Sequence, residues 1–151
     1  MYILISAMVL IADFISKMLV KANMKIGESI DLINGLLSIT YIRNKGMAWG
    51  LLENQRWLFI TGTILAVSVM LWYIIKHKNV HPTGKLGVSL AVSGALGNLV
   101  DRIFYKEGVI DFICAEFIDF PVFNIADISV CIGVGFLVIY ILFFEQNNKE
   151  S

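Results

Sequence analysis

Four long apolar stretches divide this chain, and each is about as long as a helix that crosses a lipid bilayer. They cover residues 1–20, 57–75, 86–104 and 122–144. A transmembrane helix needs about 20 predominantly apolar residues, so we expect four membrane-spanning helices. The composition agrees, because 58% of the residues are hydrophobic and only 16% are charged, whereas a soluble domain has about 25% charged residues. The sequence therefore predicts a single integral-membrane domain over residues 1–151.

The segments between the spans predict how the chain sits in the membrane. The loop at 76–85 (KHKNVHPTGK) is the most basic short connection, and basic loops stay on the cytoplasmic side. With four spans, both chain termini are then cytoplasmic, and the segments at 21–56 and 105–121 lie outside. The outer segment at about 24–55 contains LSITY, in which apolar and polar residues alternate, and glycine-containing turns surround it. This pattern predicts a small β-sheet on the outer surface.

Polar residues gather where two of the spans meet the outer surface. Asn98, Asp101 and Arg102 end the third span, and Asn124 and Asp127 begin the fourth. Spacings of three and four residues place the first three side chains on one face of a helix. Ionisable side chains inside a membrane are costly, so their clustering indicates a functional site.

The spacing of these acids leaves several interpretations open. Asp111, in the apolar run GVIDFI, also belongs to the outer side. Two neighbouring carboxylates cannot both ionise cheaply, so one can keep a proton while the other activates water for peptide hydrolysis. A transporter would instead use the acids as an ion or proton pathway. A structural interpretation has Asp101 and Arg102 pairing locally and Asp127 stabilising a helix start, and an assembly factor would need no chemistry.

Two further features have simpler interpretations. Asp13 and Lys17 are four residues apart in the first stretch. We expect a local ion pair in which Lys17 extends to the outer surface, in preference to a catalytic role, and such a pair can also brace the site. That stretch lacks the basic start of a signal peptide, and we interpret it as a retained span. Cys114 and Cys131 match no metal or disulfide pattern and are expected to be free packing residues.

Five short motifs run from the first span to the fourth. They are DFISK at 13–17, RNKGMAWG at 43–50, SGALGNLVDR at 93–102, VIDFI at 109–113 and FPVFNIAD at 120–127. In this order, and over nearly the whole chain, they resemble the motifs of lipoprotein signal peptidase. This family, also called signal peptidase II, comprises the prolipoprotein-processing aspartyl peptidases of the bacterial inner membrane.

The resemblance implies a membrane α-helical fold of four transmembrane helices with a small outer-surface β cradle. It implies a catalytic pair made of Asp111 and Asp127, while Asp119, in a second Ile-Asp-Phe sequence, has no counterpart in the family motif. Supporting or substrate-binding roles are implied for eight residues: Asn44, Gly46, Asn98, Asp101, Arg102, Asn124, Asp13 and Lys17.

The resemblance also implies a function. The chain would be an intramembrane aspartyl endopeptidase of the bacterial cytoplasmic (inner) membrane, with its active site toward the outer face. It would remove signal peptides from diacylglyceryl-modified prolipoproteins just before the lipidated cysteine. No metal and no organic cofactor is expected. The expected partners are lipid-modified prolipoprotein signal peptides and membrane lipids. Nucleic acid is not expected, because 12 basic and 12 acidic residues balance and provide no basic surface.

Overall fold

The computed structural model describes residues 1–46, 52–77 and 79–145. Residues 47–50 of the second motif and Lys78 of the basic loop therefore lie outside the described residues. All four expected helices are present, and each is long and apolar enough to cross a membrane. In chain order the elements are α1 (Tyr2–Asn23), β1 (Ser29–Ile33), β2 (Leu37–Asn44), α2 (Arg56–Lys76), α3 (Pro82–Phe104), β3 (Val109–Ala115) and α4 (Ile125–Phe143).

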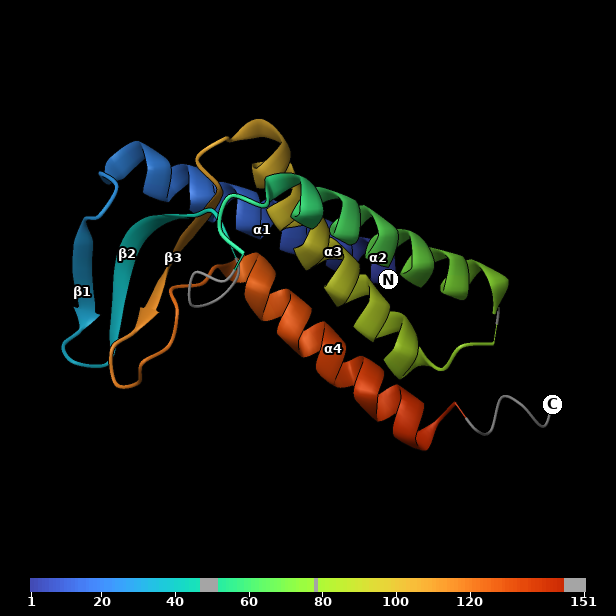
Figure 1. Ribbon diagram of the computed structural model, residues 1–151. Helices are drawn as coiled ribbons and strands as arrows, with labels where there is room; N and C mark the ends of the chain where they lie inside the picture. Colours follow the sequence, from blue (N-terminus) through green and yellow to red (C-terminus); the bar gives the residue numbers. More distant parts are fainter. Residues whose placement is uncertain (47–51, 78, 146–151) are drawn as a thin grey trace.

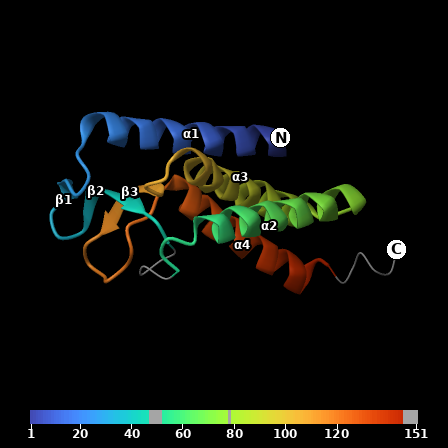
Figure 2. The same ribbon diagram turned by 45° about the horizontal axis from the view of Figure 1, so that its top comes forward.

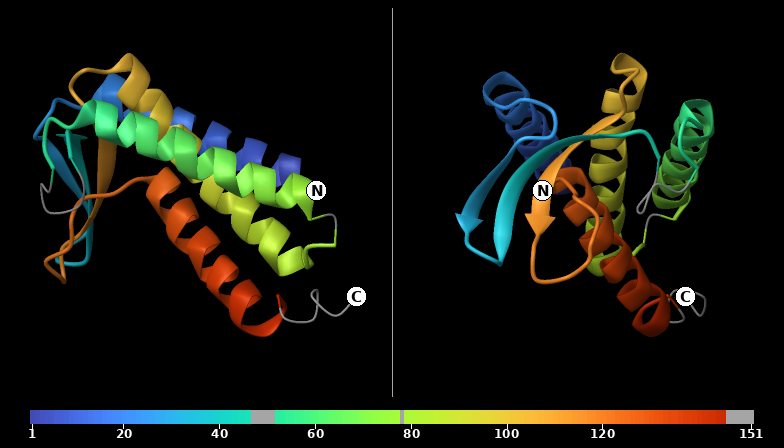
Figure 3. Two further views of the ribbon diagram at one scale, coloured as in Figure 1. Left: turned by 45° about the vertical axis from the view of Figure 1, so that its right-hand side comes forward. Right: turned by 60° about the vertical axis from the view of Figure 1, so that its left-hand side comes forward.

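The three strands lie together at one end of the helical bundle (Figure 1). The start of α1, the end of α4 and the connection between α2 and α3 all lie at the opposite end, as two further views confirm (Figure 3). We call these the sheet end and the loop end. The arrangement places the basic connection on the same side as both ends of the helical chain.

Helix α3 is the centre of the bundle, and it packs against each of the other three helices (Figure 2). Its contact with α4 is close because small residues face each other there. A Cβ atom on Gly133 of α4 would lie 2.5 Å from the Ala91 nitrogen and 2.8 Å from the Gly87 oxygen. Small residues are the usual means by which helices approach closely in lipid. Many large apolar side chains on α1, α2 and α4 are exposed and are available to contact lipid.

The sheet is antiparallel in the order β1-β2-β3. The alternating pattern at 37–41 correctly placed β2, but β3 comes from the segment at 105–121, where we expected only a connection. Its first four residues, Val109 to Phe112, are all buried, so the strand lacks the alternation that marks a half-exposed strand. Ile110 and Phe112 pack with Tyr41 of β2 and Val20 of α1, and this core fixes the sheet to the bundle.

Two helices begin at capping residues that hydropathy alone did not locate. Helix α3 begins at Pro82, four residues before the expected apolar stretch, because the His81 side chain accepts a hydrogen bond from Thr83 N–H and proline suits the first turn. Helix α4 begins at Ile125, three residues later than expected. Asn124 caps it, and Phe123 before the cap pairs with Ile113 of β3.

The close α3–α4 contact predicts different effects for two glycines of the same helix. Gly133→Ala should destabilise the protein by about 1–3 kcal/mol, because the added methyl group meets backbone atoms of α3 that cannot move aside. Gly135→Ala is the matched control, since no atom lies within 4 Å of its added Cβ. Thermal unfolding of the purified proteins in detergent measures both effects. Equal melting temperatures for the two variants would contradict the packing argument.

Candidate active site

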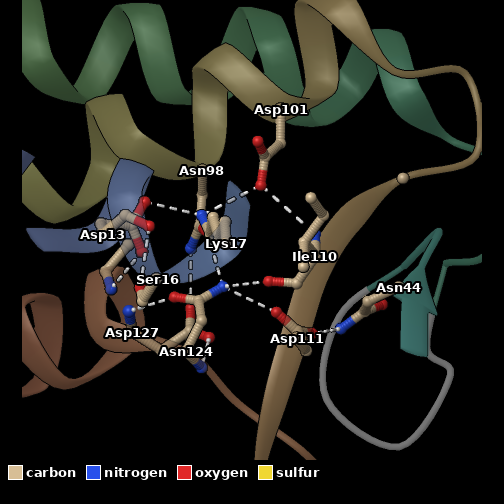
Figure 4. A network of polar contacts seen from close by, with 12 residues as sticks. Asp13, Ser16, Lys17, Asn44, Asn98, Asp101, Ile110, Asp111, Asn124 and Asp127 are labelled. Carbon is tan, nitrogen blue, oxygen red and sulfur yellow. Dashed lines mark hydrogen bonds and ion pairs between the residues drawn. The ribbon is translucent and has the colours of Figure 1, made fainter. Parts of the chain in front are cut away.

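A network of carboxylates and carboxamides lies where the sheet meets the helices (Figure 4). Asp111 projects from β3, while Asn124 and Asp127 belong to the start of α4. Asn44 ends β2, and Asn98 lies in the last two turns of α3. Residues from four elements therefore converge, although up to 83 positions separate them along the chain.

The chain brings Asp111 to the start of α4 by running back along its own strand. After β3, residues 116–119 turn, and Phe123 then exchanges hydrogen bonds with Ile113, at 2.8 Å and 3.0 Å. The next residue, Asn124, accepts a hydrogen bond from Asp127 N–H at 2.9 Å, and the Asp127 carboxylate accepts one from Asn124 N–H at 3.1 Å. This reciprocal pair is a capping box, which fixes both side chains relative to the first turn of α4.

Carboxamide groups hold each of the two aspartates. Asp111 accepts hydrogen bonds from Asn44 Nδ2 at 2.9 Å and from Asn124 Nδ2 at 2.6 Å. Asp127 accepts one from Asn98 Nδ2 at 2.7 Å. The asparagines thus act mainly on the carboxylates, and Figure 4 shows Asn124 placed between the two acids.

Lys17 joins this network from α1. Its ammonium group lies 2.8 Å from Asp13 Oδ2, 3.0 Å from Asp101 Oδ2 and 3.1 Å from Asn98 Oδ1. The expectation that Lys17 extends to the surface is wrong, because the residue is only 3% exposed. The three acceptors match the three donors of an ammonium group, so burial leaves no donor unsatisfied. The expected pair with Asp13 is present.

The spacing of Asn98, Asp101 and Arg102 predicted one polar face at the end of α3, but these side chains point in different directions. Asp101 turns toward Lys17 and also accepts a hydrogen bond from Ile110 N–H at 3.2 Å. Arg102 turns the other way, where its guanidinium lies 4.9 Å from the centre of the Phe59 ring and donates to the Gly46 carbonyl at 3.3 Å. Asp101 is therefore part of the Lys17 cluster, while Arg102 faces open space.

That open space is a cleft of about 580 Å³. Asp111 and Asp127 are the carboxylates that line it among the described residues. Asn44, Gly46, Asn98 and Arg102 supply the other polar groups of the wall. The rings of Phe120 and Phe123 are in edge contact in this wall. The apolar residues of the wall are Phe59, Val109, Phe120, Pro121, Val122, Phe123, Ile128, Cys131 and Ile132.

The environment of Asp111 favours its protonated form. The residue is only 2% exposed, and burial, together with the negative charge of Asp127, raises the pKa of Asp111 to about 7. The hydrogen bonds from Asn44 and Asn124 and the charge of Lys17 act in the opposite direction. An acid with this pKa can hold or release a proton near neutral pH, as general acid–base chemistry requires.

Other residues from the sequence analysis lie apart from this chemistry. Asp119 is exposed in the turn after β3. Both cysteines are free, as expected, but Cys131 is exposed along the cleft and not buried. Sequence reasoning also missed a backbone contact, since the Ala126 N–H donates to Asp13 Oδ1 at 3.0 Å and links α4 to α1. No side-chain pattern could have indicated this contact.

Fold and site together define a polytopic membrane protein with a cleft at the sheet end of a four-helix bundle, and two carboxylates line this cleft. Comparisons with known proteins all indicate the same family. The model of the family described as signal peptidase (SPase) II matches residues 5–143. A lipoprotein signal peptidase of Clostridioides difficile (strain 630) is 43% identical over 150 residues, which are 99% of each chain. One of Geobacillus kaustophilus (strain HTA426) is 43% identical over 152 residues, which are 99% of this chain and 98% of the relative.

Solved structures agree with this similarity. One bacterial membrane enzyme superimposes with a TM-score of 0.90 at 38% identity, over 99% of this chain and 92% of its own. A second has a TM-score of 0.85 at 38% identity, over 95% and 93%. This chain belongs to the signal peptidase II family, which confirms the resemblance seen in its motifs. It is therefore a membrane peptidase, and the transporter and assembly-factor interpretations are not needed.

The pKa of Asp111 predicts a specific pH dependence of stability. An ordinary Asp titrates near 3.9 when unfolded, so the folded protein binds the extra proton between about pH 4 and 7. This contribution to stability is fully present below pH 4 and is lost as the pH rises to about 7. Relative to Asp111→Asn, the wild-type protein should become progressively less stable over this range, by a few kcal/mol at most.

Melting temperatures measured from pH 4.5 to 8.5 test this expectation. The difference between the wild type and Asp111→Asn should grow with pH and level off above pH 7. Asp119→Asn serves as the control, because it makes the same substitution at an exposed position in the turn after β3. A flat difference for Asp111→Asn would show that its carboxylate titrates normally.

Proposed function

We propose that this protein removes signal peptides from prolipoproteins by aspartyl catalysis, with Asp111 and Asp127 as the catalytic pair. The observation that carries the proposal is that these two carboxylates line one largely apolar cleft and are each held by carboxamide donors. The relatives called lipoprotein signal peptidase support the substrate class. We further propose that the substrates carry a diacylglyceryl group and are cut just before the modified cysteine.

The surroundings of the other acids support this choice of pair. Asp13 and Asp101 both contact the Lys17 ammonium, and they face a second cavity on the α1 side of α3. A carboxylate held beside a buried ammonium is a poor base, because giving it a proton would leave that charge without a partner. Asp111 and Asp127 form no salt bridge in the described part of the chain. We assign Asp13, Lys17 and Asp101 to positioning.

The mechanism follows from two acids that share one proton. Burial favours Asp111 as the protonated member, although such a pair titrates as a unit. Asp127 takes a proton from water as the water oxygen attacks the scissile carbonyl carbon, and Asp111 gives its proton to the carbonyl oxygen. In the second step, the carbon–nitrogen bond breaks, Asp127 protonates the leaving amine, and Asp111 recovers a proton from the tetrahedral intermediate.

The remaining polar groups suggest distinct roles in binding. The side-chain nitrogens of Asn44, Asn98 and Asn124 already donate to the aspartates, so we assign these residues to holding the acids in place. Arg102 uses one donor on the Gly46 carbonyl and has others for the carbonyl groups of an extended substrate. The apolar wall of the cleft suits the small apolar side chains that precede the modified cysteine.

We also propose an orientation in the bacterial cytoplasmic membrane. The basic connection at 76–85 lies at the loop end, and basic connections favour the cytoplasm. Both termini are then cytoplasmic, and the sheet and cleft lie at the outer face. A lipid-anchored substrate would reach the cleft sideways from the bilayer.

The catalytic pair is tested by isosteric substitution. Asp111→Asn and Asp127→Asn should each lower the rate of cleavage by at least about 10²–10⁴-fold, because Asn keeps the shape but cannot transfer the proton. The double variant should be hardly worse than either single variant, since the two acids act as one unit. The assay is cleavage of a diacylglyceryl-modified precursor by the purified protein.

Asp119→Asn is the matched control, because it has the same local Ile-Asp-Phe sequence but lies in an exposed turn. It should cleave at the normal rate. Melting temperatures establish that each inactive variant is folded. Normal cleavage by folded Asp111→Asn would show that Asp111 is not a catalytic residue. If only Asp101→Asn lost activity, the catalytic role would be reassigned from Asp111 to Asp101.

The orientation is tested by labelling single cysteines in intact cells. In a Cys114→Ala, Cys131→Ala background, which should remain active, a membrane-impermeant thiol reagent should label Asn34→Cys in the β1–β2 turn. The same reagent should label Asn79→Cys at the loop end only after the membrane is opened, because that end faces the cytoplasm. Both positions are exposed in the folded protein. Labelling of Asn79→Cys in intact cells would invert the topology.

A further inference from the structure

A third cavity lies beside the cleft at the sheet end, and its wall is polar and basic. Its volume is about 250 Å³. Lys45 follows β2, Arg56 begins α2, Arg102 belongs to α3, and Lys106 lies in the turn before β3. Asn54, Tyr105, Gly108 and Asn44 complete the wall. No carboxylate lines this cavity among the described residues, so it concentrates positive charge.

The four cations of this cavity form no salt bridge with a carboxylate of the described residues. The salt bridges of Lys17 with Asp13 and Asp101 involve none of these four side chains. Arg56 instead donates to two carbonyl oxygens at the end of α3, those of Arg102 at 2.5 Å and Ile103 at 2.7 Å. Arg102 also faces the charges of Asp111 and Asp127 from the other side. Lys45 and Lys106 are exposed and therefore provide the charge that is most available to a ligand.

The surroundings of the cavity are apolar and exposed. Trp57, next to Arg56, is 71% exposed, and Phe104, next to Tyr105, is 74% exposed. Both lie at the sheet ends of membrane-spanning helices, at the depth where aromatic residues meet lipid headgroups. A ligand that fits both features has an anionic group for the cavity and hydrocarbon chains for the helix surfaces beside it.

We propose that this basic cavity binds the phosphate of an anionic phospholipid headgroup in the outer leaflet. Asn44 and Arg102 line both this cavity and the cleft, so the bound lipid lies at the rim of the active site. The basic side chains contact the phosphate, and the acyl chains extend along α2 and α3 past Trp57 and Phe104. Neither Asp111 nor Asp127 lines this cavity, and its place in the outer leaflet rests on the orientation proposed above.

Binding can be measured without the peptidase reaction. The full-length protein in neutral detergent is titrated with short-chain phosphatidylglycerol, and the melting temperature is recorded, because a ligand that binds the folded state raises it. Phosphatidylcholine of the same chain length, inorganic phosphate and a short acidic peptide are titrated in parallel. Phosphatidylglycerol should raise the melting temperature at concentrations where the other three do not.

Two variants assign the effect to the cavity. Lys45→Gln with Lys106→Gln should weaken binding of phosphatidylglycerol by roughly thirtyfold, the combined effect expected of two lysines at an anionic headgroup. Lys25→Glu is the matched control, because it lowers the net charge by the same two units at the exposed turn before β1 and should bind normally.

Each other outcome overturns the proposal. Equal loss of binding in the control would show that binding depends only on the net charge of the protein. Unchanged binding in the double variant would show that the lipid does not bind at this cavity. A similar shift with phosphatidylcholine would show that the phosphate charge is not recognised. A similar shift with inorganic phosphate would identify a site for free anions, and a shift with the acidic peptide alone would identify a peptide site.

Discussion

The buried ammonium group of Lys17 is the interaction on which the rest of the site depends. Lys17 lies inside the bundle, where an unpaired charge is costly, and it has Asp13, Asp101 and Asn98 as partners. Each partner is attached to a further element: Asp13 to the start of α4, Asp101 to the backbone of β3, and Asn98 to Asp127. One cation thereby fixes the relative positions of α1, α3, β3 and α4.

Close packing provides the second condition for this arrangement. The network is compact only because α3 approaches α1 and α4 closely. A Cβ atom at Gly97 would lie 2.7 Å from Asp13 Oδ2 and 3.2 Å from the Ala126 Cβ. The absence of a side chain at this position therefore makes room for the Asp13 carboxylate between three helices. The position of the Asp13 carboxylate therefore depends on a glycine in α3 as well as on the charge of Lys17.

Much of the fold could be predicted from the sequence, because membrane insertion imposes long apolar stretches that are visible without any tertiary information. Strand β2 was visible because apolar and polar residues alternate at 37–41, although its two buried residues, Ser38 and Tyr41, do not follow that alternation. Strand β3 was not, because Val109 to Phe112 are buried on both sides. Proximity of the acids at one end of the bundle was also predictable, but the distinction between Asp101 and Asp111 was not. It depends on which carboxylate meets Lys17, and spacing along a helix cannot show this.

Asn124 has two structural roles, because its side chain caps α4 and also donates a hydrogen bond to Asp111. This shared use has a consequence for the order in which a newly made chain acquires its parts. Helix α4 is the last of the four to be synthesised, and Asp127, Asn124 and one wall of the cleft arrive with it. A nascent chain with three helices in the bilayer contains Asp111 without its partner acid or its carboxamide from α4. If Asp111 and Asp127 are the catalytic pair, as proposed above, the site is complete only after this last helix has docked.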